Sequence, residues 1–125
     1  MNLIKNLIKR IKTWWFEWNL KRNYTPDTYV YEDDEILAFH DSTPVAPVHV
    51  LIIPKMAKIT GPSGILESDS LLIGKMVFVA TEIARNLGID KSGFRLVMNN
   101  GLDAGQTVPH IHLHLLGGET LLGLA

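Results

Sequence analysis

Alternating hydrophobic and polar positions near the carboxyl end of the chain predict a strand with two different faces. Histidines occupy positions 110, 112 and 114, and Ile111, Leu113 and Leu115 lie between or directly after them. Successive side chains of a strand point to opposite faces, so this spacing places the histidines on one face and the aliphatic residues on the other. On a helix the same residues would form no continuous apolar stripe. We therefore predict a strand from His110 to Gly118 with its aliphatic face buried.

The remaining pattern predicts four more strands and one long helix. Apolar residues at helical spacing predict a helix over residues 69–87, and Gly88 follows where a glycine commonly ends a helix. The other strands are predicted at residues 29–31, 36–40, 49–53 and 94–99, the first two as a hairpin around the acidic turn 32–35. The run 49–53 is almost continuously hydrophobic, which is typical of a central strand. The order predicts an α+β fold with an antiparallel sheet and one packed helix.

The amino-terminal segment has a different pattern. Its apolar residues recur at helical spacing, which predicts an amphipathic helix over residues 3–20; they are Leu3, Ile4, Leu7, Ile8, Ile11, Trp14, Trp15 and Trp18. Residues 1–23 carry a net charge of +5, and the rest of the chain carries −6. Three interpretations stay open: packing on the domain or on a partner subunit, contact with a membrane surface or another protein, and a targeting peptide. We divide the chain into this helix, 1–23, and a domain, 24–125.

Composition narrows the classes of function. The chain has 125 residues, 46% hydrophobic and 20% charged, as expected for one globular domain. No apolar run approaches the length that spans a bilayer. There is no cysteine, which excludes disulfides, thiolate nucleophiles and cysteine-bound zinc. We expect a cytoplasmic protein, with peripheral membrane contact through residues 3–20 as an alternative. Nucleic-acid binding is not expected as a main role, because the basic residues gather in one helix.

The three histidines follow a glycine-containing loop that suits phosphate binding. Gly101, Gly105, Gln106 and Thr107 precede them, and backbone N–H groups of such loops can approach anions closely. Imidazole can act as a nucleophile, shuttle protons or bind a metal. The sequence lacks the glycine patterns of P-loop and Rossmann proteins. An alternative is a three-histidine zinc site that includes His49, although no carboxylate is clearly placed to support it.

These motifs resemble those of the histidine triad (HIT) family. His110 to Leu116 is similar to its signature of three histidines separated by single hydrophobic residues. Residues 31–41, 46–55 and 99–106 also look like the Hint branch of that family. The resemblance covers about residues 29–118.

The resemblance implies a nucleotide hydrolase or transferase that acts at the α-phosphorus. His112 would be the nucleophile and form a nucleotidyl-histidine intermediate, with its Nδ1–H held by the carbonyl of His110. His114 and the loop N–H groups would bind the phosphate oxygens, and His49 would support the triad. Thr107 would help to protonate the leaving group. The remaining implied nucleotide contacts are Asp41 to the ribose, Phe39 and His40 beside the purine, Asn99 on the sugar-phosphate side, and Gly105 and Gln106 in the loop.

The expected activity is hydrolysis of purine nucleoside 5′-phosphoramidates of the AMP type, as a homodimer, with no cofactor and no bound metal. Two alternatives are a dinucleoside polyphosphate hydrolase and a nucleotide-binding regulatory or scaffold module with incidental catalysis. Two segments depart from the family. Residues 119–125 lack its Trp-containing tail, which leaves the leaving-group preference open, and residues 1–23 replace its short helix.

Overall fold

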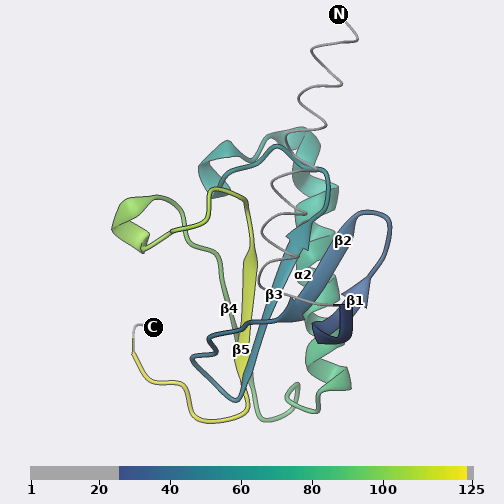
Figure 1. Ribbon diagram of the computed structural model, residues 1–125, viewed down its shortest axis with the longest axis vertical. Helices are drawn as coiled ribbons and strands as arrows, with labels where there is room; N and C mark the ends of the chain where they lie inside the picture. The colour runs from purple at the N-terminus through teal and green to yellow at the C-terminus, as the bar shows by residue number, and fades with distance from the viewer. Residues whose placement is uncertain (1–25, 124–125) are drawn as a thin grey trace, which may run out of the picture.

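The computed structural model describes residues 26–123, which form a five-stranded sheet with one α-helix against it (Figure 1). The elements in chain order are η1 (Pro26–Thr28), β1 (Tyr29–Glu32), β2 (Ile36–His40), β3 (Val48–Pro54), η2 (Pro62–Gly64), η3 (Glu67–Asp69), α2 (Ser70–Asn86), β4 (Phe94–Val97), η4 (Leu102–Ala104) and β5 (Leu113–Gly117), where η marks a short 3-10 helix. The predicted α+β class, antiparallel sheet and single packed helix are confirmed for these residues.

The strand order is β1-β2-β3-β5-β4, and every neighbouring pair is antiparallel. The predicted hairpin is present, and its acidic turn is tied to α2: Lys75 Nζ lies 2.9 Å from Asp33 Oδ2 and 2.9 Å from Glu35 Oε1. The hydrogen bond from Tyr31, with those of Lys75 and the backbone, holds the pKa of Asp33 well below its usual range. The run 49–53 lies within β3, which is flanked by β2 and β5 and is central as predicted.

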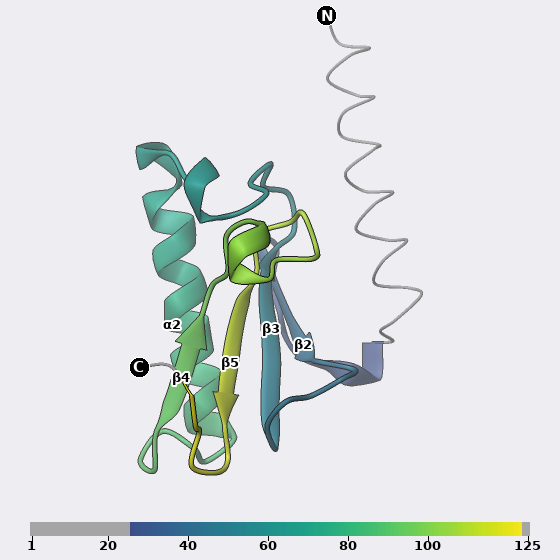
Figure 2. The same cartoon turned by 90° about the vertical axis from the view of Figure 1, so that its left-hand side faces the viewer.

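Helix α2 covers one face of the sheet, packing mainly on β3 and β5 (Figure 2). Its bounds differ by one residue at each end from the predicted 69–87, and Gly88 follows with a left-handed φ of 73°. The predicted apolar stripe is buried at Met76, Val79 and Ile83, among others. These residues meet the α2-facing side chains of the strands, which are Ile36, Ala38, Val50, Ile52, Leu113 and Leu115. This cluster is the main hydrophobic core.

The histidine strand is shorter than predicted. Strand β5 begins at Leu113, so His114 lies in the strand while His110 and His112 precede it. The ladder with β3 stops because Pro54 has no N–H, and its carbonyl accepts a bond from the His110 ring instead. Ile111 N donates to Ile59 O at 2.8 Å, which keeps this stretch extended. The predicted alternation of faces begins before the strand does: Ile111, like Leu113 and Leu115, is buried as predicted.

Two other predictions concern the ends of elements. The strand predicted at 94–99 ends at Val97. The amphipathic helix predicted at 3–20 lies outside the described residues. No helix within residues 26–123 is long and apolar enough to cross a membrane.

Candidate active site

Asp41, His49 and His114 come together on the sheet face that α2 leaves free. Strand register explains the meeting: His114 lies directly opposite Leu51, and His49 is two residues before Leu51, so the two histidines are diagonal neighbours on one face. His49 Nε2 lies 2.9 Å from His114 Nδ1 and 3.3 Å from Asp41 Oδ2. Asp41 follows β2 directly, and its N–H donates to His49 O at 2.8 Å. Three chain segments therefore build one polar cluster.

His112 is held in one tautomer by the backbone. Its Nδ1 lies 2.7 Å from His110 O. A carbonyl oxygen can only accept, so Nδ1 carries the proton and Nε2 of the neutral ring keeps its lone pair. The rings of His112 and His114 meet edge to face with centroids 5.0 Å apart. The imidazole nitrogen that points away from this backbone anchor has a free lone pair beside a second imidazole, so it could act as a nucleophile.

A chain of hydrogen bonds also assigns the protons of His49 and His114. Val45 N–H donates to His49 Nδ1 at 3.1 Å, so His49 carries its proton on Nε2. That proton is shared between His114 Nδ1 and the carboxylate of Asp41. Since Nδ1 of His114 accepts, its own proton lies on Nε2. His114 thus presents an N–H donor on the nitrogen that points away from His49.

Both supporting histidines stay neutral at neutral pH. Burial lowers the pKa of His114 to about 4, with repulsion from His112 and His49 adding to the effect and Asp41 opposing it. Burial likewise lowers the pKa of His49, against the attraction of Asp41. Neutral rings are what the hydrogen-bond chain requires, because each must both donate and accept.

Asp41 has two sets of partners. Its Oδ1 accepts from the backbone N–H of Thr43 at 2.8 Å and from the Thr43 hydroxyl at 3.2 Å, which closes an Asx turn. Its Oδ2 faces His49. The carboxylate therefore fixes both the loop after β2 and the ring of His49.

The loop before the histidines is braced by Gln106. Its amide donates to Thr60 O and, at 3.0 Å, to Val108 O, and its Oε1 accepts from Gly101 N at 2.8 Å. Gly105 takes the left-handed conformation at φ 77°, which a side chain would strain, and so closes the η4 turn. Gln106 thus fixes the shape of the loop with its side chain.

The other predicted site residues are placed as follows. Phe39 is buried on the same face as His114, because it lies opposite Leu51 in the register. His40 lies opposite Val50, whose side chain belongs to the α2-facing core, so the register turns it away from the imidazoles. Asn99 lies two residues after Val97, the strand partner of His114, and Thr107 is exposed in the loop.

Several supporting groups were not identified from the sequence. They are the backbone N–H of Val45, the carbonyl of Pro54, and the pair Asn100 and Gly61. Asn100 Oδ1 accepts from Ser63 N at 2.8 Å, and a Cβ at Gly61 would lie 2.7 Å from that oxygen. No sequence signal marks the two backbone groups, and an Asn-Gly pair such as 100–101 is by itself only a turn signal.

The donor atoms of Asp41, His49 and His114 lie within 4.8 Å of one another, so these residues could hold a metal ion. The interpretation that no carboxylate is clearly placed to support a zinc site is wrong, because Asp41 lies beside His49. Asp41 was expected at the ribose and not beside a metal, because it and His114 are far apart in the sequence and only the sheet brings them together.

Comparison with known proteins agrees with this arrangement. A model of the HIT domain matches residues 22–121. The chain is 50% identical over 98 residues to an uncharacterized HIT-like protein of Synechocystis, covering 78% of this chain and 84% of that protein. It is 42% identical over 99 residues to a 14 kDa zinc-binding protein of Brassica juncea, covering 77% and 85%. A HIT family hydrolase from Legionella pneumophila has a similar structure, with a TM-score of 0.75 at 44% identity, covering 78% of this chain and 87% of that one. The spacing of the three histidines, the sheet that carries them and these matches together show that the chain belongs to the HIT family.

Proposed function

We propose that this protein hydrolyses purine nucleoside 5′-phosphoramidates of the AMP type at the α-phosphorus, as in the Hint branch of the family. The observation that carries the proposal is the tautomer of His112, whose Nδ1–H is held by His110 O and whose Nε2 is available for attack. The similarity to a Legionella protein described as a HIT family hydrolase supports hydrolysis as the reaction class.

The reaction proceeds in two displacements. Nε2 of His112 attacks the α-phosphorus, a phosphorus–nitrogen bond of substrate breaks, and the amine leaves with a proton that the Thr107 hydroxyl relays from water. Water then attacks the nucleotidyl-histidine, the bond between phosphorus and Nε2 breaks, and AMP leaves; the proton that this water releases combines with the hydroxide left by the first step. Covalent catalysis replaces one difficult step by two easier ones.

His114 stabilises the charge that develops on the phosphoryl oxygens. Its Nε2–H is a preorganised donor, because His49 holds Nδ1 at 2.9 Å and fixes the ring. The low pKa of His114, about 4, means that it donates as a neutral ring. His49 acts through His114 and is a positioning residue.

The nucleotide lies along the free face of the sheet. Asp41 accepts from the ribose hydroxyls, since a carboxylate has acceptor sites beyond those used by Thr43 and His49. Phe39 borders the base, with His40 at the rim through its backbone, and Asn99 contacts the sugar-phosphate side. The loop of Gly105 and Gln106 encloses the phosphate.

The enzyme acts as a homodimer. Within the described residues, β4 ends the sheet and pairs only with β5, so its other edge offers N–H and C=O groups to a second copy. Light scattering after size-exclusion chromatography tests this state; a monomer at all concentrations would contradict it.

The decisive experiment is hydrolysis of an adenosine 5′-phosphoramidate by the wild type and by His112→Ala, with diadenosine triphosphate in parallel. We expect turnover of the phosphoramidate that the variant loses while it still binds AMP. Faster cleavage of the dinucleotide would instead support the polyphosphate hydrolase. AMP binding without turnover of either substrate would support a nucleotide-binding module.

A second candidate is a zinc site at Asp41, His49 and His114. The clustered donor atoms and the similarity to a protein described as zinc-binding favour it. Zinc would replace the hydrogen bond between His49 and His114, because both nitrogens would become ligands. Metal analysis of protein purified without a histidine tag tests this candidate: about one equivalent of zinc would support it.

A further inference from the structure

The loop that carries the candidate nucleophile rests on a distant segment of the chain. We call residues 98–112, which join β4 to β5, the site loop, and residues 59–63, which come after β3, the support segment. Both lie at the end of the sheet at which β3 finishes (Figure 1). Three backbone groups of the support segment form hydrogen bonds with the site loop: Ile59 O with Ile111 N at 2.8 Å, Thr60 O with the Gln106 amide, and Ser63 N with Asn100 Oδ1 at 2.8 Å. The support segment therefore contacts the site loop near both of its ends.

The backbone anchor of His112 is part of these contacts. Ile111 N and His110 O belong to one peptide group. Its N–H donates to Ile59 O at 2.8 Å, and its carbonyl accepts from His112 Nδ1 at 2.7 Å. A peptide group is planar, so the direction of the N–H fixes the direction of the carbonyl. The ring of His110 adds a bond of 2.9 Å to Pro54 O at the end of β3. The group that holds the tautomer of His112 is therefore oriented by residues outside the site loop.

Gly61, a buried residue in the middle of the support segment, leaves room for two side chains of the site loop. A Cβ at this position would lie 2.7 Å from Asn100 Oδ1 and 3.0 Å from Gln106 Oε1. Both oxygens are held in place, because Ser63 N donates to the first and Gly101 N donates to the second, each at 2.8 Å. The backbone of Gly61 is extended, with φ −168° and ψ 177°, which any residue can adopt. Glycine is therefore needed at this position for space and not for conformation.

The middle of the site loop contributes little to the hydrophobic core. Within residues 100–109 every residue except Gln106 is exposed. A small displacement of the loop should therefore cost little free energy of unfolding, because little apolar surface would leave the core. The reaction is more sensitive, since a misplacement of about 1 Å in groups that hold the reacting atoms can cost about 10²-fold in rate.

We propose that the support segment positions the site loop for catalysis, and that Gly61 is the position at which this contact tolerates a side chain least. Gly61 acts through Asn100 and Gln106 on the loop that encloses the phosphate, while Ile59 acts on the carbonyl that holds His112. Gly61 is thus a positioning residue, because it acts only through other residues. This role rests on the proposed function, because it concerns the rate of that reaction.

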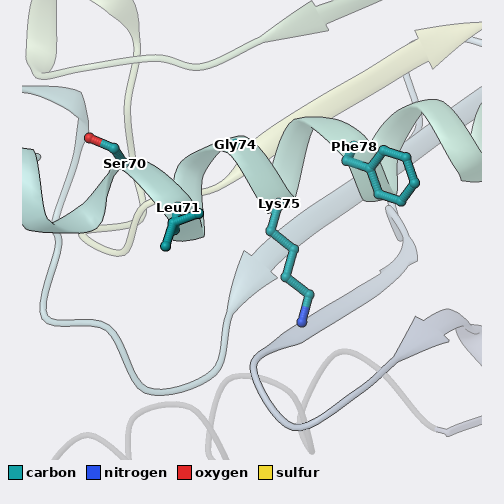
Figure 3. A pocket seen from close by; sticks show the side chains of 5 residues that line it. All are labelled: Ser70, Leu71, Gly74, Lys75 and Phe78. Carbon is teal, nitrogen blue, oxygen red and sulfur yellow. The ribbon is translucent and has the colours of Figure 1, made fainter.

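Two other glycines of the described chain supply matched controls. Gly64 lies in the same turn, and a Cβ there would have Ile59 Cγ2 as its nearest contact, at an ordinary 3.7 Å. Gly74 lines a shallow pocket on the outer face of α2, where an added Cβ would meet no other part of residues 26–123 within 4 Å (Figure 3). Neither glycine has a positive φ. Alanine at either position therefore adds the same methyl group without pressing on the site loop.

Steady-state hydrolysis of an adenosine 5′-phosphoramidate by the wild type and the three glycine variants tests this role. We expect Gly61→Ala to lower kcat about 10²-fold and to change KM little, because the displaced loop acts on the reacting atoms. Its urea unfolding should stay close to that of the wild type. Gly64→Ala and Gly74→Ala should keep the kcat of the wild type. An unchanged kcat in Gly61→Ala, a loss confined to KM, or an equal loss in Gly64→Ala would overturn the positioning role.

Asn100→Ala provides a second variant that does not depend on how Gly61→Ala folds. Asn100 is exposed, so its truncation should not unfold the protein, yet it removes the acceptor of the bond from Ser63 N. We expect a smaller loss of kcat than in Gly61→Ala. The double variant should have a higher kcat than Gly61→Ala, because the added Cβ no longer meets Oδ1. An unchanged kcat in Asn100→Ala, or losses that multiply in the double variant, would contradict action through this contact.

Nuclear magnetic resonance separates the positioning role from the proposed function, because the spectra need no substrate. In isotope-labelled Gly61→Ala we expect shifted signals from the groups that these contacts hold: the amides of Gly101 and Ile111 and the ring nitrogens of His112. The same signals should keep their positions in the two control variants. A wild-type protein that does not hydrolyse the phosphoramidate would contradict the proposed function. Unchanged signals in Gly61→Ala would overturn the positioning role, whether or not the wild type is active.

Discussion

The two faces of the sheet differ in composition: one carries buried aliphatic side chains, and the other carries histidines. On the α2 face, Val50, Ile52 and Leu115 are fully buried among aliphatic residues. On the other face lie His49, directly before Val50 in β3, and His114, directly before Leu115 in β5, joined by a 2.9 Å hydrogen bond. Because side chains alternate along a strand, two residues that are neighbours in the sequence lie on opposite faces, one in the hydrophobic core and the other at the candidate site.

The comparison teaches that stability and activity are separable at neighbouring positions. Apolar burial on the α2 face contributes to the free energy of unfolding, and this contribution does not depend on pH. The site face contains imidazoles whose proton positions depend on single backbone partners, namely Val45 N for His49 and His110 O for His112. Substitutions on the α2 face are therefore expected to lower the free energy of unfolding, and substitutions on the site face are expected to lower the activity.

The largest expected effect is on the site face. His112→Ala removes the proposed nucleophile, so turnover of an adenosine phosphoramidate should fall on the order of 10⁴-fold or more. The free energy of unfolding should change little, since His112 is not fully buried. Steady-state kinetics and urea unfolding check both expectations. Turnover that survives would show that another group attacks phosphorus.

Leu115→Ala, one residue from His114, tests the core face. Leu115 is fully buried, and its truncation should lower the free energy of unfolding by about 2–5 kcal/mol. The activity per folded molecule should be nearly that of the wild type, because the side chain points away from the imidazoles. A large loss of activity in a folded Leu115→Ala protein would break the separation of the two faces.

His114→Gln should lower turnover by about 10²–10³-fold, the usual cost of removing one preorganised donor to a developing oxyanion. The substrate complex should form with little change, so the loss should appear in kcat. If KM rises and kcat stays constant, His114 binds the ground state instead.

The stability of the wild type should depend on pH through His114. Its pKa in the folded protein, about 4, lies below the value of an exposed histidine, so the unfolded chain binds more protons between about pH 6.5 and pH 4. The free energy of unfolding should therefore fall as pH falls through that window, and the contribution of His114 should be constant above it. Urea unfolding across this range should show a flatter profile for His114→Gln, and an equal slope in both proteins would contradict the assignment.

The smallest effect is expected at Leu71, which lies on neither face of the sheet. Leu71→Ala removes an exposed side chain on the outside of α2, so the free energy of unfolding should change by less than about 0.5 kcal/mol. Activity should stay that of the wild type. A stability loss like that of Leu115→Ala would show that this surface is covered.

Local pattern determined much of this protein. The alternation of Ile111, Leu113 and Leu115 with the histidines predicted which face is buried, because the two-residue period of a strand is a local property. The apolar spacing of α2 and the glycine after it predicted the helix to within one residue, for the same reason. The family motifs and the candidate nucleophile were also visible in the sequence.

The tertiary structure determined which side chains meet at the candidate site, because no local sequence pattern specifies contacts between distant residues. Strand pairing brings His49 to His114 across 65 residues and places Asp41 beside them, since register depends on partners far away in the chain. The residue at which β5 begins depends on Pro54 of another strand, and the position of the proton on His49 depends on the N–H of Val45. The loop around Gln106 takes its shape from Thr60, which lies 46 residues earlier. The sequence thus determined the chemical groups and their faces, whereas long-range packing determined which nitrogen carries each proton.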